Sequence, residues 1–92
     1  MPGYVKTCQI LGNGDFRRGK DLIEAIALRM QHAREKHPVF AEGKFHALGV
    51  IHAEYRELEH AVTRGEGKDR ERDEALDTAT TALRFFIGEH EA

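Results

Sequence analysis

The stretch "ELEHAVTRGEGKDRERDEAL", residues 57–76, decides the fold, because one helix has to end and another has to begin within it. Gly65 and Gly67 interrupt the helical pattern in the segment "TRGEGKDR", and glycine is a common residue where a helix stops and the chain turns. Two helices that are joined by so short a connection pack antiparallel. The sequence therefore predicts a helical hairpin.

Apolar residues recur at intervals of three and four on both sides of this turn, which is the spacing of one face of an α-helix. A helix from about Lys44 to Val62 would carry the stripe Phe45, Leu48, Ile51, His52, Tyr55, Leu58 and Val62. A helix from about Asp69 to Ile87, ended by Gly88, would carry the stripe Leu76, Ala79, Leu83, Phe86 and Ile87. We expect these two stripes to form the core of the hairpin.

A further helix is predicted before the hairpin, from Asp21 to about Lys36. Asp21 followed by Glu24 resembles a capping box, and Pro38 should end the helix because the residue before a proline avoids helical angles. Its expected apolar face consists of Leu22, Ile23, Ile26, Ala27, Met30 and Ala33. Residues 1–19 show little periodicity and are predicted to be an extended arm with a turn at "GNGD". The expected fold is all-α, with one domain over residues 1–92.

Composition limits the classes of function. A chain of 92 residues holds one small domain, and its net charge of -2 gives no strong field for nucleic acid or anionic lipid. No stretch approaches the roughly 20 apolar residues of a membrane span, and the start of the chain lacks the apolar core of a signal peptide. Cys8 is the single cysteine, which excludes an intrachain disulfide and fits a reducing compartment. We therefore expect a cytoplasmic protein that binds neither nucleic acid nor membrane.

Two pairs of carboxylates flank the turn at matching depth. Glu57 and Glu74 each lie five residues from the turn-side end of their predicted helix, and Glu54 and Asp77 each lie eight. At about 1.5 Å of rise per residue, both pairs lie roughly 8–12 Å from the turn, so antiparallel packing would bring them level. Four carboxylates at one place repel one another unless cations intervene, and hard divalent ions prefer oxygen ligands. One Glu-x-x-Glu alone is usually a solvated helix edge, but two such pairs at matching depth on neighbouring helices predict a cage for Mg²⁺ or Mn²⁺.

With these residues in view, the chain resembles the MazG-like all-α nucleoside triphosphate pyrophosphohydrolases. Their signature is Glu-x-x-Glu, a spacer of variable length, and Glu-x-x-Asp on the next helix. Here it reads "EYRE" (54–57), sixteen intervening residues and "EALD" (74–77), and the resemblance covers roughly residues 37–88. It implies that Glu54, Glu57, Glu74 and Asp77 bind Mg²⁺, and that one of the first two also orients the attacking water.

The same resemblance implies the reaction and the assembly. Water would attack a nucleoside triphosphate between its α- and β-phosphates, and the products would be a monophosphate and pyrophosphate. Members of the family are homodimers or dimers of dimers, in which helices from two chains complete a four-helix bundle. We therefore expect this chain to form a MazG-like bundle by dimerisation.

The sequence departs from the family pattern in two places, and this affects which residues could contact phosphate. Ala53 stands where many members have a further glutamate, and the family's C-terminal helix with basic residues has no counterpart in these 92 residues. Arg84, one to two turns beyond Asp77 on the same face, is a candidate phosphate contact, and a solvated arginine is the alternative. Lys44 and His46, near the start of the second predicted helix, are the other candidates.

The same residues allow two other interpretations, a histidine-containing metal site and a non-catalytic module. Glu57-x-x-His60 matches one arm of a di-iron carboxylate bundle, but the sequence holds no second copy, and His32, His37, His46 and His90 share no spacing that would assemble a zinc site. A non-catalytic interpretation stays open. Three amphipathic helices with residual apolar surface could form a small oligomerisation or partner-binding module, in which the acids only keep the protein soluble.

Overall fold

The computed structural model describes residues 16–17 and 19–91, and within these residues it is all-helical, with no strand. Helix α2 spans Gly19–Lys36, α3 spans Lys44–Thr63 and α4 spans Lys68–Ile87. All three predicted helices are confirmed, with ends within two residues of those expected. The predicted arm lies outside the described residues, as do Cys8 and the expected "GNGD" turn, except that residues 16 and 17 form a turn and Gly19 already belongs to α2.

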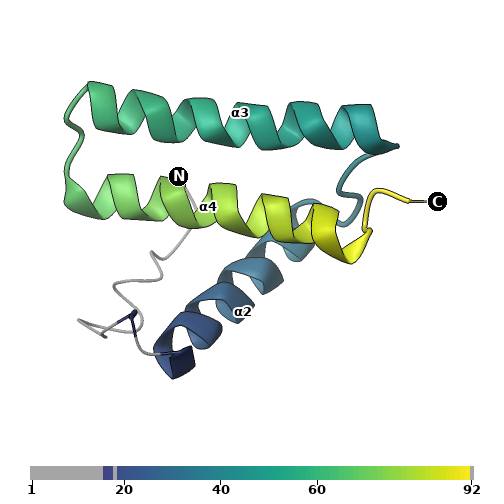
Figure 1. Ribbon diagram of the computed structural model, residues 1–92, viewed down its shortest axis with the longest axis horizontal. Coiled ribbons are helices and arrows are strands. Elements are labelled where there is room, and N and C mark those ends of the chain that lie inside the picture. Colours follow the sequence, from purple (N-terminus) through teal and green to yellow (C-terminus); the bar gives the residue numbers. More distant parts are fainter. Residues whose placement is uncertain (1–15, 18, 92) are drawn as a thin grey trace.

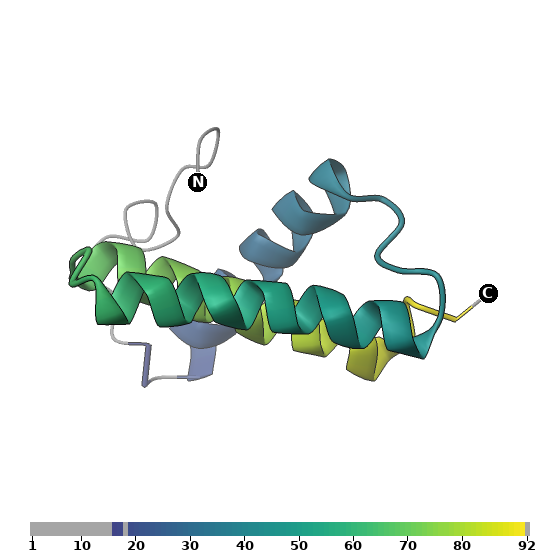
Figure 2. The same cartoon turned by 90° about the horizontal axis from the view of Figure 1, so that it is seen from above.

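Helices α3 and α4 form the predicted antiparallel hairpin and run side by side along their length (Figures 1 and 2). The turn between them has the expected chemistry, because Gly65 and Gly67 adopt φ angles of 61° and 107°, which glycine tolerates best. Helix α2 crosses α4 obliquely and packs against it (Figure 1). The hairpin thus places the acidic motifs of α3 and α4 on neighbouring helices.

Helix ends are set by local chemistry, with one correction. Gly88 is the left-handed C-cap of α4, as predicted, and its N–H bonds the carbonyls near the end of the helix. The capping box at Asp21 is wrong, because α2 begins two residues earlier, at Gly19. Asp21 therefore lies in the first turn, where its negative charge still favours the positive end of the helix dipole.

The predicted apolar stripes of the hairpin are not the buried faces of this chain. On α3 the side chains of Phe45 and Leu48 are 79% and 60% exposed, and on α4 Phe86 is 84% exposed. The fully buried residues of α3 are Ala47 and Ala61, while α4 buries a polar face that consists of Asp73, Glu74, Asp77, Thr80 and Arg84. Periodicity located the stripes correctly, but it does not determine which stripe faces a neighbouring helix within one chain.

Helix α2 shows the same difference. It buries Ala25, Arg29 and Met30, whereas Ile23, expected on the inner face, is 67% exposed. A small apolar core lies where the segment between α2 and α3 meets the start of α3. Phe40 and Ala41 of this segment pack there with Ala47 and Val50 of α3. None of the helices in the described part of the chain combines the length and the apolar character that crossing a membrane requires.

Candidate metal centre

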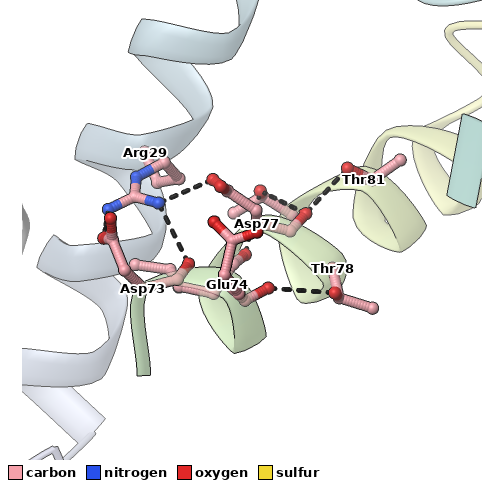
Figure 3. Close-up of polar contacts among 8 residues, drawn as sticks. Arg29, Asp73, Glu74, Asp77, Thr78 and Thr81 are labelled. Carbon is pink, nitrogen blue, oxygen red and sulfur yellow. Dashed lines mark hydrogen bonds and ion pairs between the residues drawn. The ribbon is translucent and has the colours of Figure 1, made fainter. Parts of the chain in front are cut away.

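Helix α4 buries three carboxylates within little more than one turn. Asp73, Glu74 and Asp77 are all buried, and Glu74 has an exposed fraction of 0%. Figure 3 shows these side chains on α4 beside Arg29 of α2. Buried carboxylates are rare unless a cation or a set of hydrogen bonds compensates them, so the surroundings of each one are informative.

Arg29 compensates two of the three. It is 1% exposed, and its Nη1 donates to Oδ1 of Asp77 at 2.6 Å and to the backbone carbonyl of Asp73 at 3.2 Å. Its Nη2 forms an ion pair with Oδ1 of Asp73. Burial by itself would lower the pKa of Arg29, but the hydrogen bonds to both aspartates raise it, so the guanidinium stays charged. This contact joins α2 to the acidic face of α4.

The other acidic pair lies on α3, across from this face. Burial raises the pKa of Glu54 to about 7, and the negative charges of Glu57 and Asp77 add to the effect. Burial also raises the pKa of Glu74 to about 7, with a further contribution from the charge of Glu57, against which Arg70 acts. Because Glu57 acts on carboxylates of both helices, the two predicted motifs interact electrostatically across the hairpin.

Several oxygens of this cluster have no hydrogen-bond partner. Among the described residues these are buried atoms, namely Oε2 of Glu54, Oδ2 of Asp73, both carboxylate oxygens of Glu74 and Oδ2 of Asp77. Unpaired buried carboxylate oxygens are the ligand type that Mg²⁺ and Mn²⁺ prefer, so these residues fit a hard divalent cation. In the described residues, however, no three His, Cys, Asp or Glu side chains are arranged as a ready-made metal site.

A small cavity of about 100 Å³ opens beside the cluster. Its polar wall includes Glu54 and Asp77 together with Thr80, Thr81, His37 and Arg84. Since a water molecule takes about 30 Å³ of liquid volume, the cavity has room for a few waters or a partly hydrated cation, but not for a nucleoside.

Arg84, the first candidate for a phosphate contact, is buried rather than solvated. Its Nε donates to Oε1 of Glu89 at 2.6 Å, and its Nη2 donates to the carbonyl of His37 at 3.0 Å. Its guanidinium also lies 5.0 Å from the centre of the Phe40 ring. Arg84 therefore borders the cavity, while these contacts bind the segment between α2 and α3 to the end of α4.

Lys44 and His46, the other candidates, are not brought to the cluster. They lie in the first turn of α3, about 12–15 Å along the helix axis from Glu54 at the usual rise per residue. The ammonium of Lys44 lies 5.5 Å from the centre of the Phe45 ring, and Nδ1 of His46 accepts a hydrogen bond from the backbone N–H of Glu42 at 3.0 Å.

The sequence analysis missed Arg29 and Asp73, which complete the buried acidic face. Neither belongs to an acidic pair or an apolar stripe. One feature of the sequence could have indicated that Arg29 is buried. It lies four residues after Ala25 and four before Ala33, so it shares a helix face with small residues.

Known proteins add nothing to this assignment. The chain matches no protein-family model, and no match is found among curated proteins or among solved structures. The resemblance to the MazG-like pyrophosphohydrolases therefore rests on the two acidic motifs and on the helices that carry them.

Proposed function

We propose that this protein is a Mg²⁺-dependent nucleoside triphosphate pyrophosphohydrolase of MazG-like type that acts as a homodimer. One observation carries the proposal: Glu74 is fully buried, and neither of its oxygens has a hydrogen-bond partner among the described residues. Besides burial, the negative charges of Glu57 on α3 and Asp77 on α4 raise its pKa. A buried carboxylate without a partner is unfavourable by several kcal/mol unless it takes up a proton or a cation. Binding of a dication would compensate Glu74 and its neighbours together.

The residues of the cluster have distinct parts in this proposal. Glu54, Glu57, Glu74 and Asp77 hold the cation, and Glu54 and Asp77 also line the small cavity, where one of them can orient the attacking water. When bound, Mg²⁺ supplies positive charge that stabilises the charge developing on the phosphate oxygens. Because the cavity is too small for a nucleoside, the base and the sugar lie outside it. The products are a nucleoside monophosphate and pyrophosphate.

The homodimer is supported by the apolar residues that one chain leaves exposed. On α3 they are Phe45, Leu48, Tyr55 and Val62, and on α4 they include Phe86 and Ile87. Exposed apolar surface of this extent is typical of a face that another protein covers. Two hairpins that pack through such faces form a four-helix bundle.

A melting experiment with the full chain tests the metal centre. We expect Mg²⁺ and Mn²⁺ to raise the melting temperature of the wild type, because a ligand of the folded state at 100 times its Kd stabilises it by about 2.7 kcal/mol. In a domain of this size, that corresponds to at least about 10 °C. Glu57→Gln should lose most of this shift. Glu57 and Glu59 are both exposed, but Glu59 lies outside the two motifs, so Glu59→Gln should keep the shift.

The reaction is tested on the same proteins by chromatography of the products. Incubation with nucleoside triphosphates and Mg²⁺ should yield monophosphate and pyrophosphate in equal amounts, and Glu57→Gln should not support turnover. A wild type that does not respond to either metal would contradict the metal centre and, with it, the proposed reaction.

A non-catalytic oligomerisation or partner-binding module is the second candidate. It is favoured by the exposed apolar stripes and by the lack of a ready-made three-ligand metal site in the described residues. This function predicts that divalent ions hardly alter the melting temperature. Stabilisation by metal without turnover would indicate a binding protein or a degenerate relative of the enzymes.

A further inference from the structure

Arg29 makes at least three contacts with Asp73 and Asp77 through its two terminal nitrogen atoms. Its Nη1 lies between Oδ1 of Asp77 and the backbone carbonyl of Asp73, and its Nη2 pairs with the carboxylate of Asp73. The planar guanidinium makes such multiple contacts with fixed geometry, unlike the ammonium group of a lysine. Figure 3 shows the side chain reaching from α2 to the acidic face of α4.

The two oxygens of Asp77 differ in their contacts. Oδ1 accepts the hydrogen bond from Arg29, whereas Oδ2 is buried and has no hydrogen-bond partner within the described part of the chain. The same side chain lines the cavity beside Glu54. Asp77 can therefore offer one oxygen to a cation in the cavity while the other stays bound to Arg29.

The number of oxygens that a carboxylate offers distinguishes cations. Mg²⁺ demands near-octahedral geometry with oxygens at about 2.0–2.1 Å and is held by few carboxylates and several waters, whereas Ca²⁺ takes 6–8 oxygens at about 2.3–2.6 Å and often binds both oxygens of one carboxylate. A carboxylate that is restricted to one oxygen thus suits Mg²⁺ better than Ca²⁺.

We propose that Arg29 is a specificity-determining residue of the candidate metal centre: by holding Oδ1 of Asp77, it keeps this carboxylate a one-oxygen ligand and thereby favours Mg²⁺ over Ca²⁺. The inference rests on the proposed function, because it takes Asp77 as a ligand. It goes beyond that function in giving a role to a residue that lies outside both acidic motifs.

The test compares the Kd values of Mg²⁺ and Ca²⁺, measured by isothermal titration calorimetry on the full chain without nucleotide. Arg29→Met alone would leave both Asp73 and Asp77 buried without their counter-ion, which is strongly destabilising. The variant is therefore the double substitution Arg29→Met with Asp73→Asn, in which Asp77 alone keeps an uncompensated charge. It frees Oδ1 of Asp77, and we expect the ratio of the Ca²⁺ Kd to the Mg²⁺ Kd to fall by about tenfold.

Two further variants complete the design. Asp73→Asn alone retains the hydrogen bond from Arg29 to Oδ1 of Asp77, so its ratio should stay close to that of the wild type. Arg29→Lys retains the charge but loses the planar fork, so its ratio should fall between those of the wild type and the double variant. If circular dichroism shows that the double variant does not fold, the ratio measured for Arg29→Lys tests the role of Arg29 instead.

The outcomes separate this inference from the proposed function. An unchanged ratio in a folded Arg29 variant overturns the role of Arg29 and leaves the metal centre intact, provided that the wild type binds Mg²⁺. If the wild type binds neither ion, the metal centre itself is refuted, and the role of Arg29 with it.

Discussion

Glu74 shows most directly what the single residue contributes to this molecule. It lies next to Asp73 and one turn from Asp77 in α4. Both aspartates pair with Arg29, whereas the two oxygens of Glu74 accept no hydrogen bond from any described residue. The sequence predicted that Glu74 would lie level with the acidic pair of α3, because depth along two antiparallel helices follows from counting residues. It could not predict the partners of Asp73 and Asp77, since these depend on where α2 crosses α4.

Replacing Glu74 should separate stability from metal binding. Glu74→Gln removes the buried charge, so we expect the metal-free protein to gain about 1–3 kcal/mol of unfolding free energy at pH 8. The same variant should lose most of its stabilisation by Mg²⁺. Urea denaturation with EDTA and with Mg²⁺ measures both effects, and Glu59→Gln on the exposed side of α3 should change either by less than about 0.5 kcal/mol. A variant that is less stable than the wild type at pH 8 would contradict this account of Glu74.

The same carboxylates predict an unusual dependence of stability on pH. The pKa values of Glu54 and Glu74 rise from 4.5 to about 7 on folding, so between these values the folded state binds protons more tightly than the unfolded chain. The unfolding free energy of the metal-free protein should therefore fall as the pH rises from about 4.5 to about 7, and then level off. Glu89 acts in the opposite direction, because its pKa is lowered by Arg34 and its stabilisation is lost only as the pH falls below its ordinary value of 4.5.

Urea titrations at pH 5, 6, 7 and 8 in the presence of EDTA measure this dependence. Saturating Mg²⁺ should flatten the decline, since a bound cation favours the deprotonated carboxylates. Stability that increases from pH 5 to pH 7 without metal would show that the two glutamates are not buried as charged groups.

At the scale of the element, the sequence predicted the helices well and their buried faces poorly. Helix ends depend on local chemistry, such as Gly65 and Gly67 at the turn and Pro38 after α2, and these signals are legible in a single chain. The buried face depends on which neighbour a helix meets. Ala47 and Ala61 are the residues that α3 buries in this chain, while Phe45, Leu48 and Val62 are exposed.

The segment between α2 and α3 depends on one buried arginine of α4. Arg84→Met would leave the carbonyl of His37 without this donor and would remove the cation from the Phe40 ring, so we expect a loss of about 2–4 kcal/mol of unfolding free energy. Urea denaturation measures the loss, and hydrogen exchange should locate it in residues 37–43.

Arg34→Met is the matched control for this prediction. Arg34 pairs with the same Glu89 but is half exposed, so its removal should lower the unfolding free energy by no more than about 1 kcal/mol. If Arg84→Met is as mild as Arg34→Met, the buried contacts of Arg84 do not anchor the segment, and its place beside the cavity gains weight as the reason for its position.

At the scale of the whole molecule, the chain buries a charged face beside its small apolar core and leaves several large apolar residues exposed. The acidic face of α4 and Arg29 are buried, whereas Phe45, Phe86 and other large apolar residues of the hairpin are exposed. On α3 the exposed residues Phe45, Leu48, Tyr55 and Val62 are three, seven and seven positions apart, a spacing that places them on one side of the helix. Such an arrangement is stable when a second hairpin covers the apolar face, which supports a homodimer as the working form.

The last prediction therefore concerns assembly. Leu48→Glu places a charge within the exposed stripe of α3, so it should convert a dimer into a monomer by burying an unpaired carboxylate in the interface. Size-exclusion chromatography with light scattering should give the wild type twice the 10.4 kDa of one chain, and the variant a single chain. Ile23→Glu, an equally apolar-to-acidic change at an exposed position of α2, should leave the dimer intact. A monomeric wild type at about 100 μM, a concentration at which any dimer with a micromolar Kd would form, would refute the homodimer.

Because all four proposed ligands belong to one hairpin, monomeric Leu48→Glu should still be stabilised by Mg²⁺. Any loss of turnover in this variant would place the nucleoside contacts at the interface between two chains.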